Sequence, residues 1–121
     1  MTRIMIVDDT PLMRSMLTSI LSEHGFHVVH VAVNGQEAVD MYPIIKPDGV
    51  IMDVSMPELD GVEALKLILE KDPAAKIIMC STFAQQSFIL RALEIGAKDF
   101  IAKPFTPFQV VDAVKRVFNK N

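Results

Sequence analysis

Residues 3–9 read RIMIVDD, a short apolar run that ends in two aspartates. Four further β-rich runs follow along the chain. They are His27–Val31, Gly49–Met52, Lys76–Cys80 and Asp99–Ala102. Several are apolar at nearly every position, which is typical of strands buried on both faces of a parallel sheet. With Arg3–Val7 as the first run, the sequence predicts five strands.

Stretches with helical spacing separate these strands. The first carries an apolar stripe of Leu12, Met13, Met16, Leu17, Ile20 and Leu21, and the last a stripe of Phe108, Val111, Val114, Val117 and Phe118. Alternating strands and helices with short connections predict an α/β fold, a (βα)5 doubly wound parallel sheet with helices on both faces. In such sheets the functional crevice lies at the carboxyl ends of the strands.

Helix-start signals precede several of the helical stretches. Thr10-Pro11 and Thr106-Pro107 each place a hydroxyl before a proline at the first helical position. Asn34 and Asp60 each stand three residues before a glutamate, which is the spacing of a capping box. We expect all of these polar side chains to cap helices.

The composition bounds the class of protein. The chain has 121 residues, about the length of one domain, and we expect a single domain over residues 1–121. Twelve basic and fifteen acidic residues give a net charge of −3, which offers no reason to expect direct nucleic-acid binding. The N-terminal apolar run is too short for a signal peptide or a membrane span. The single cysteine, Cys80, fits a reducing compartment, so we expect a cytoplasmic domain without membrane insertion.

Residues suited to phosphoryl chemistry follow four of the strands. They are Asp8 and Asp9 after the first, Asp53 after the third, Ser81 after the fourth and Lys103 after the fifth. Carboxylates held close together repel each other, and a hard divalent cation such as Mg²⁺ relieves that repulsion. One carboxylate can then attack phosphorus to give an aspartyl phosphate. The hydroxyl and the ammonium group would neutralise charge on the phosphoryl oxygens.

These motifs together resemble the receiver domains of two-component response regulators, and in particular the single-domain chemotaxis members. The motifs are IMIVDD at residues 4–9, IMDVSMPELDG at 51–61, IIMCST at 77–82 and GAKDFIAKPF at 96–105. The resemblance covers essentially the whole chain. It implies a flavodoxin-like fold with the strand order 2-1-3-4-5, an order for which such chemotaxis proteins are a known example.

The resemblance also implies a role for each site residue. Asp53 would accept a phosphoryl group from the phosphohistidine of a histidine kinase. Asp9, Asp53 and the backbone carbonyl of Ser55 would bind Mg²⁺, for which Mn²⁺ can substitute, and Asp8 would act mainly through water. Lys103 would contact the phosphoryl group, and the Lys103-Pro104 peptide would be cis.

Two switch residues follow from the same resemblance. Ser81 would move to hydrogen-bond a phosphoryl oxygen, and Phe100 would turn inward on activation. Thr82 departs from the family pattern, because most members carry Ala or Gly there, and we expect it to restrict phosphoryl access or the movement of Ser81. Ser55 and Phe83 offer no carboxylate or amide to orient a water molecule, so we predict that autodephosphorylation is not fast.

A candidate partner surface lies in residues 87–95, SFILRALEI, which are apolar around more of a helix than one buried face needs. With Phe100 and the start of the last helix, this stretch resembles the family's output surface. We expect Phe88 or Ile89 to be exposed and to contact a partner. The alternative, that both side chains belong to the core, stays open.

The favoured function is phosphorylation-controlled signalling by protein contact, with the flagellar motor switch as the specific expected target. We expect a monomer, with dimerisation on phosphorylation left open, and no enzyme activity beyond assisting its own phosphorylation and dephosphorylation. A phosphorelay shuttle and a receiver excised from a larger regulator are alternatives. Two further alternatives belong to other classes of protein. One is a small Mg²⁺-dependent phosphohydrolase, which is disfavoured because the chain leaves no residues for a cap domain. A flavodoxin-like cofactor binder would place an acidic loop, Asp8-Asp9, against a flavin phosphate.

Other groups of residues favour structural interpretations. His24, His27 and His30 recur at intervals of three but span a helix end and a strand, so a shared metal is not expected. Most of the eight methionines are expected to fill the core. We interpret Cys80 as a small buried hydrophobic residue.

Overall fold

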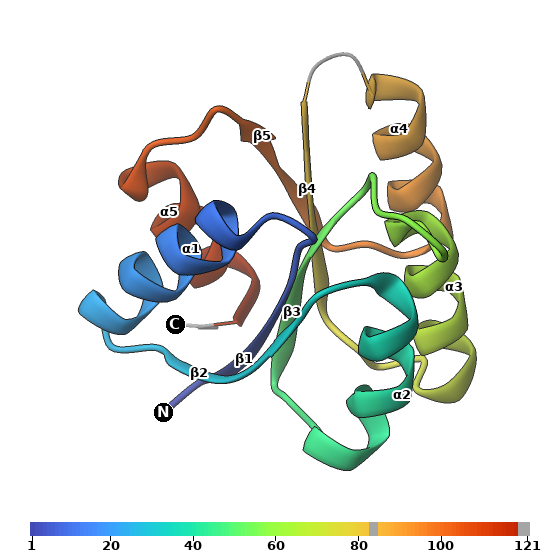
Figure 1. The fold of residues 1–121 in the computed structure, drawn as a ribbon, viewed down its shortest axis with the longest axis horizontal. Helices are drawn as coiled ribbons and strands as arrows, with labels where there is room; N and C mark the ends of the chain where they lie inside the picture. The colour runs from blue at the N-terminus through green and yellow to red at the C-terminus, as the bar shows by residue number, and fades with distance from the viewer. Residues whose placement is uncertain (83–84, 119–121) are drawn as a thin grey trace.

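The computed structural model describes residues 1–82 and 85–118, which form a parallel sheet with helices on both faces (Figure 1). The strands are β1 (Arg3–Val7), β2 (His27–Ala32), β3 (Gly49–Asp53), β4 (Ile77–Thr82) and β5 (Asp99–Lys103). The helices are α1 (Pro11–Glu23), α2 (Gly35–Ile45), α3 (Gly61–Lys71), α4 (Gln86–Ile95) and α5 (Pro107–Phe118). The predicted alternation is confirmed, and β2 to β5 extend one or two residues further at their carboxyl ends than the sequence indicated.

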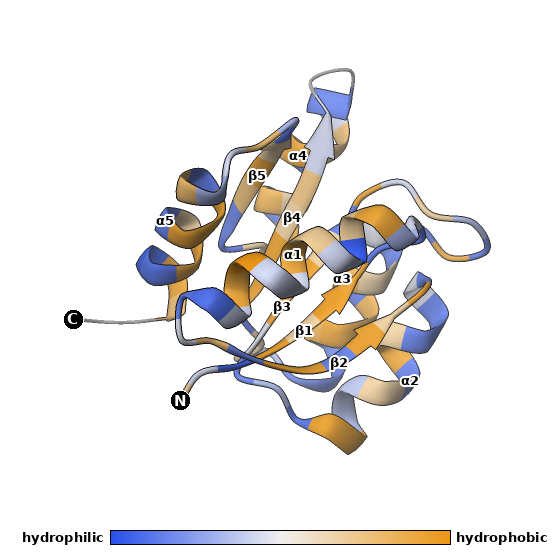
Figure 2. Ribbon diagram, turned by 60° about the vertical axis from the view of Figure 1, so that its left-hand side comes forward, coloured by the Kyte–Doolittle hydropathy of each residue, from blue (hydrophilic) through white to orange (hydrophobic). Residues whose placement is uncertain are grey.

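The strand order is β2-β1-β3-β4-β5, which confirms the flavodoxin-like arrangement. Helices α1 and α5 cover one face of the sheet, and α2, α3 and α4 cover the other (Figure 1). Alternate residues of one strand therefore enter different cores. Ile4 and Ile6 of β1 belong to the core beneath α1 and α5, whereas Met5 and Val7 belong to the core beneath α2 to α4. The apolar colouring along the strands in Figure 2 reflects this burial on both faces.

The register of the central strands fixes the position of the residues that follow them. Strands β1 and β3 pair in parallel, with Val7 opposite Met52. The next residues, Asp8 and Asp53, therefore leave the sheet side by side at its carboxyl edge. Because β3 is buried along its whole length, this pair begins inside the protein rather than on its surface.

The predicted helix stripes are only partly correct. Leu17, Ile20 and Leu21 of α1 are buried, but Leu12 is 64% exposed and Met16 is also exposed. On α5, Phe108 is 76% exposed. The reason is geometric, because a helix on a sheet contacts it along one narrow face and residues on the flanks of a wide apolar stripe remain in water.

The predicted caps are confirmed at three of the four helices. Asn34 Oδ1 accepts a hydrogen bond from Glu37 N at 2.8 Å, and Asp60 Oδ1 accepts one from Glu63 N at 2.9 Å. Thr106 Oγ1 accepts from Gln109 N at 3.2 Å. The prediction for Thr10 is wrong: its side chain makes no capping hydrogen bond to α1, and its backbone N–H donates to Asp8 Oδ1 at 2.9 Å. The Asp8 carboxylate thus organises the turn that the hydroxyl was expected to organise.

No helix within residues 1–82 and 85–118 combines the length and the hydropathy needed to cross a membrane.

Candidate functional site

Three carboxylates meet at the carboxyl edge of the sheet. Asp8 and Asp9 follow β1, Asp53 ends β3, and one carboxylate oxygen from each lies within 4.8 Å of the others. Asp8 is 1% exposed and Asp53 is 6% exposed, whereas Asp9 faces solvent. The structure thus brings together the acidic residues that the sequence placed at two strand ends.

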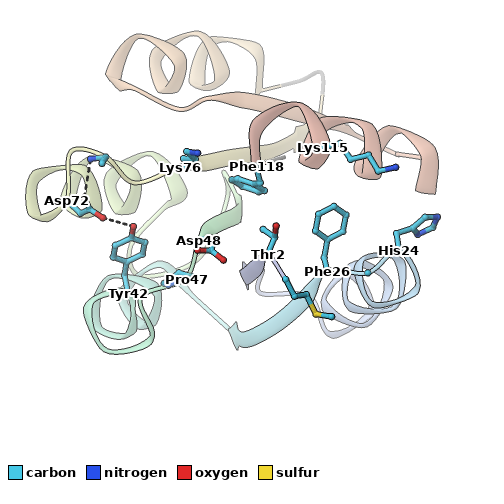
Figure 3. Close-up of a pocket in the computed structure, with 13 residues that line it drawn as sticks. Thr2, His24, Phe26, Tyr42, Pro47, Asp48, Asp72, Lys76, Lys115 and Phe118 are labelled. Atoms are coloured by element: carbon cyan, nitrogen blue, oxygen red, sulfur yellow. Dashed lines mark hydrogen bonds between the residues drawn. The ribbon is translucent and has the colours of Figure 1, made fainter. Parts of the chain in front are cut away.

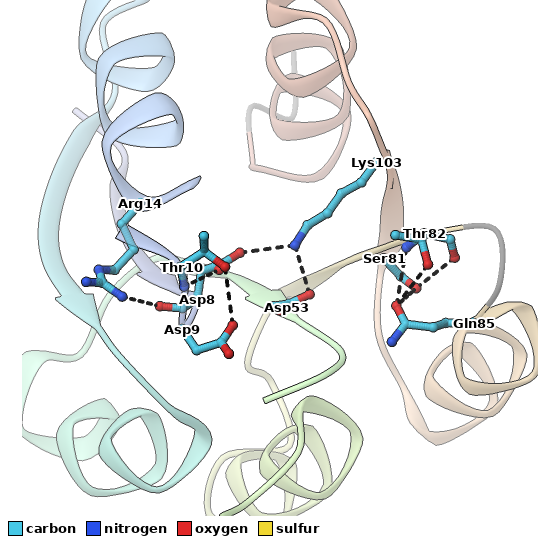
Figure 4. Close-up of polar contacts among 9 residues, drawn as sticks. All are labelled: Asp8, Asp9, Thr10, Arg14, Asp53, Ser81, Thr82, Gln85 and Lys103. Atoms are coloured by element: carbon cyan, nitrogen blue, oxygen red, sulfur yellow. Dashed lines mark hydrogen bonds and ion pairs between the residues drawn. The ribbon is translucent and has the colours of Figure 1, made fainter. Parts of the chain in front are cut away.

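Lys103 supplies a positive charge to this acidic group. It ends β5, two strands away from β3, and its side chain reaches across the intervening strand (Figure 4). Lys103 Nζ lies 3.1 Å from Asp53 Oδ1 and 3.3 Å from Asp8 Oδ2. The Lys103-Pro104 peptide is cis, as the resemblance implied.

Burial and charge oppose each other at Asp53. Removal from water raises the pKa of the Asp53 carboxyl above its ordinary value, the nearby Lys103 ammonium lowers it, and Asp8 and Asp9 raise it further. The net direction is upward. For Lys103, burial lowers the pKa, but the charge and hydrogen bond of Asp53, together with Asp8 and Cys80, raise it, and the net direction is upward, so the ammonium stays charged. One cation thus leaves the repulsion among three carboxylates incompletely compensated.

The start of α3 holds the Asp53 backbone in place. Gly61 N donates to the carbonyl of Val54 at 2.7 Å, and a Cβ at Gly61 would overlap the carbonyl oxygen of Asp53. A side chain at this position would therefore push α3 away from the site. Sequence reasoning identified Asp60 as a cap but missed the role of Gly61, although the Asp-Gly pair was a visible signal.

Arg14 is a second residue that sequence reasoning missed. Its guanidinium donates a hydrogen bond from Nη1 to the backbone carbonyl of Asp8 at 2.8 Å (Figure 4). Thr10 N donates to the Asp8 carboxylate at the same turn. Asp8 is therefore held through both its backbone and its side chain, which fixes the direction in which the acidic loop faces.

Ser81 lies on β4, the strand that pairs with β3, and its hydroxyl is engaged away from the aspartates. Ser81 is buried, and its Oγ lies 2.7 Å from Gln85 Oε1 and 3.0 Å from the Thr82 carbonyl oxygen. Figure 4 shows Ser81, Thr82 and Gln85 as a polar group distinct from the one that joins Asp8, Asp53 and Lys103. The contact between Gln85 and Ser81 is not foreseeable from the sequence, because nothing in the position of Gln85 along the chain indicates which side chain it meets.

The residues expected to form a partner surface separate into two groups. Phe88 is 47% exposed and Phe100 is 41% exposed, so both are accessible. The expectation that Phe88 or Ile89 is exposed is therefore confirmed at Phe88. Ile89 is buried in the core beneath α2 to α4, so its inclusion in the exposed surface is wrong. Neighbouring helix positions are about 100° apart, which turns Ile89 to the sheet while Phe88 faces outward. Phe83 lies outside the described residues.

The donor set fits a hard divalent cation. Carboxylate oxygens are the ligands that Mg²⁺ prefers, and a site with few carboxylates leaves positions for water. The three aspartates supply these oxygens, and they carry more negative charge than Lys103 balances. Ser55 lies two residues beyond Asp53 and is exposed; the role of its backbone carbonyl stays a prediction.

The other candidate clusters do not form comparable sites. Within the described residues, the only group of acidic, histidine or cysteine side chains close enough to share a metal is that of the three aspartates. His24 Nδ1 contacts the Ile20 carbonyl, and His30 Nε2 pairs with Glu37 at 2.8 Å. Burial raises the pKa of the Cys80 thiol to about 12, which is consistent with an unreactive core residue.

A cavity of about 760 Å³ lies away from the acidic residues, near the N-terminus and the end of α5 (Figure 3). Its lining mixes Lys76 and Lys115 with Asp48 and Asp72. Asp72 accepts a hydrogen bond from the Tyr42 hydroxyl at 2.8 Å, and burial and this carboxylate raise the pKa of Tyr42. Asp48 accepts a hydrogen bond from Arg3 N at 2.7 Å, so both carboxylates of this cavity already have partners within the fold. The cavity is therefore a weaker candidate site than the carboxyl edge of the sheet.

The fold and the acidic site have counterparts among known proteins. Residues 4–115 match the response regulator receiver domain, and the chain belongs to this family. Its relatives include the chemotaxis protein CheY of Thermotoga maritima, 50% identical over 95% of this chain and 96% of that protein. CheY of Bacillus subtilis is also 50% identical, over 97% of this chain and 98% of that protein.

A solved structure is similar as well. CheY in a complex with CheX, BeF3 and Mg²⁺ from Borrelia burgdorferi matches with a TM-score of 0.91 and 34% identity, covering 95% of this chain and 87% of that one. Membership of the receiver family makes this chain a two-component signalling protein rather than a cap-lacking phosphohydrolase or a flavodoxin-like cofactor binder.

Proposed function

We propose that Asp53 accepts a phosphoryl group from a histidine kinase in a Mg²⁺-dependent reaction. The observation that carries this proposal is the position of Asp53: its carboxylate is buried at a strand end, beside two further aspartates and 3.1 Å from Lys103 Nζ. A helix cap or a surface ion pair would need neither the burial nor the two extra negative charges.

The transfer needs the groups that this site supplies, a bound Mg²⁺ ion and a phosphoramidate donor. An oxygen of the Asp53 carboxylate attacks phosphorus, an O–P bond forms, and the N–P bond of phosphohistidine breaks. The leaving imidazole takes up a proton. Mg²⁺ bound by Asp9, Asp53 and the Ser55 carbonyl, with Asp8 acting through water, would neutralise charge on the phosphoryl oxygens. Lys103 already lies against Asp53 and would pair with a phosphoryl oxygen.

Phosphorylation would act through two residues that differ in exposure. Ser81 is buried on β4, the strand next to the one that carries Asp53, and would turn to donate a hydrogen bond to the new phosphoryl group. Phe100 is exposed in this structure and would turn inward, next to the groove of about 300 Å³ that Phe100, Ser81 and Ile89 help to line. The phosphoryl group stabilises one of two existing conformations by binding it more tightly.

The proposed output is control of chemotaxis or motility by protein contact. The support is the 50% identity to CheY proteins over nearly their whole length. The exposed Phe88 and Phe100 provide apolar contact area for the target, for which a flagellar motor switch is the specific proposal. We further propose that residues 1–121 act as one domain in the cytoplasm, as a monomer that could pair when phosphorylated.

Intact-mass measurement tests the phosphoacceptor. The chain is incubated with a small phosphoramidate donor, with and without Mg²⁺, beside Asp53→Asn and the matched control Asp40→Asn on the exposed face of α2. We expect one added phosphoryl group in the unchanged chain and in Asp40→Asn, none in Asp53→Asn and none without metal. Labelling of Asp53→Asn, or equal labelling with and without Mg²⁺, would overturn the proposal.

The lifetime of the adduct tests a separate expectation. Ser55 carries no carboxylate or amide, so it cannot hold an attacking water in line with the phosphoryl group. We expect decay over minutes rather than seconds after the donor is removed, and faster decay in Ser55→Asn, which adds an amide. Mass spectra taken at intervals measure both. Equal lifetimes in the two proteins would contradict this explanation.

A further inference from the structure

Gln85 forms a compact hydrogen-bonded group with the end of β4. Its Oε1 lies 2.7 Å from Ser81 Oγ, 3.3 Å from Thr82 N and 3.4 Å from Thr82 Oγ1 (Figure 4). The backbone N–H of Thr82 can only donate, so it fixes the oxygen of the carboxamide, rather than its nitrogen, toward this group. Both hydroxyls are then donors to a single acceptor atom.

This geometry engages the hydroxyl that the proposed switch needs. Ser81 Oγ carries one proton, and that proton is directed to Gln85 Oε1 or, more weakly, to the Thr82 carbonyl at 3.0 Å. A phosphoryl oxygen on Asp53 is an acceptor and would require the same proton. Because Ser81 is buried, water is not freely available to satisfy its hydroxyl while it changes partner.

Thr82 strengthens the same arrangement. Its backbone N–H and its hydroxyl both point to Gln85 Oε1, so they hold the carboxamide in the orientation that receives Ser81. An alanine or glycine at this position would leave only the backbone donor. Although Thr82 is exposed, it thus restrains Ser81 indirectly, by orienting the Gln85 carboxamide that Ser81 contacts.

We infer that Gln85 is a positioning residue that holds Ser81 in the unphosphorylated arrangement, with Thr82 as its support. This inference rests on the proposed function of Asp53. Phosphorylation must break the Ser81–Gln85 hydrogen bond before Ser81 can reach the phosphoryl group. Gln85 therefore weakens the affinity of the site for a phosphoryl group without touching that group.

The test measures binding of beryllium fluoride, a phosphoryl mimic, to the full chain in Mg²⁺ by titration calorimetry. We expect Gln85→Ala to bind it roughly two- to tenfold more tightly, the range expected for loss of one competing hydrogen bond. Thr82→Ala should shift the affinity in the same direction by less. Gln86→Ala is the matched control, because Gln86 is the exposed neighbour and takes no part in the group around Gln85 Oε1.

A double-mutant cycle shows whether the effect passes through Ser81. In a Ser81→Ala background the hydroxyl that Gln85 holds is gone, so adding Gln85→Ala should leave the affinity for beryllium fluoride unchanged. A general loosening of the loop would instead give the same gain in both backgrounds. Thermal unfolding of each variant confirms that the proteins compared are folded.

The possible outcomes separate this inference from the proposed function. If the unchanged chain fails to bind beryllium fluoride, or Asp53→Asn binds it equally well, the proposed function fails and this inference fails with it. If binding depends on Asp53 but Gln85→Ala matches Gln86→Ala, or its gain persists without Ser81, only the inference is overturned.

Discussion

The Asp53 carboxyl group lies in surroundings that oppose its ionisation more than they favour it. Lys103 is close enough to pair with it, but burial and the two neighbouring aspartates outweigh that single cation. A group held in this way stores unfavourable energy that a bound cation or a change in charge can release. The property that destabilises the fold at this residue would favour the proposed binding of metal and phosphoryl groups.

The raised pKa of Asp53 predicts a pH dependence of stability. In the unfolded chain the carboxyl ionises near its ordinary value of 3.8, whereas in the folded chain it holds its proton to higher pH. Its contribution to stability therefore falls as pH rises from about 4 through the raised pKa, and stays constant beyond it. In the variant Asp53→Asn, the asparagine resembles the protonated form of Asp53 and does not titrate. Lys103 still has Asp8 as an ion-pair partner in that variant.

Thermal unfolding of the unchanged chain and of Asp53→Asn in metal-free buffer measures this dependence. We expect similar melting temperatures near pH 4, and an advantage of the asparagine variant that grows as the pH rises through the raised pKa of Asp53 and then levels off. Asp40→Asn, on an exposed helix face, should show no such trend. An advantage that shrinks as the pH rises would contradict the assigned direction.

At the scale of the elements, the two helices that begin with Thr-Pro are started in different ways. At α5, Thr106 Oγ1 accepts from Gln109 N while Gln109 Oε1 accepts from Thr106 N at 2.9 Å, which is a complete capping box. At α1 the Thr10 side chain makes no cap, and the Asp8 carboxylate orders the turn. The threonine side chain of the Thr-Pro pair therefore contributes more to the stability of α5 than to that of α1.

Alanine substitutions measure this difference. We expect Thr106→Ala to lower the free energy of unfolding by about 1 kcal/mol, the usual cost of losing a cap. Thr10→Ala should cost a few tenths of that amount, because no cap is lost. Urea unfolding of the two variants beside the unchanged chain gives both values. Equal losses would show that the Thr10 hydroxyl supports α1 after all.

At the scale of the whole molecule, the sheet gathers residues that are distant in sequence. Asp8, Asp53 and Lys103 come from β1, β3 and β5, and they meet only because parallel strands all end at one edge. A ligand held by several of these strand ends binds the folded chain and has no equivalent site in the unfolded one. Its binding therefore stabilises the entire fold rather than one loop.

Magnesium should accordingly raise the melting temperature. Above the dissociation constant, each tenfold increase in Mg²⁺ is expected to add about 1.4 kcal/mol, or roughly 5 °C for a chain of this size. Asp9→Asn should weaken this response strongly, because it removes one of the three carboxylates while leaving both ion pairs of Lys103 intact. A Mg²⁺ response in Asp9→Asn equal to that of the unchanged chain would place the metal elsewhere.

The sequence by itself determined the alternation of strands and helices and the chemical groups at the strand ends. Those features are local: apolar runs specify buried strands, and the residue after each strand is read directly from the chain. The order of the strands came from the resemblance to receiver domains, because alternation alone is compatible with more than one order. The structure confirms that order.

The tertiary structure alone decided how individual side chains are used. It buried Ile89 and exposed Phe88 and Leu12, since the angle at which each helix meets the sheet selects which part of a wide apolar stripe is covered. It also directed the Ser81 hydroxyl to Gln85. Such contacts depend on how two separately formed elements pack against each other. The local sequence pattern does not specify the distance between them.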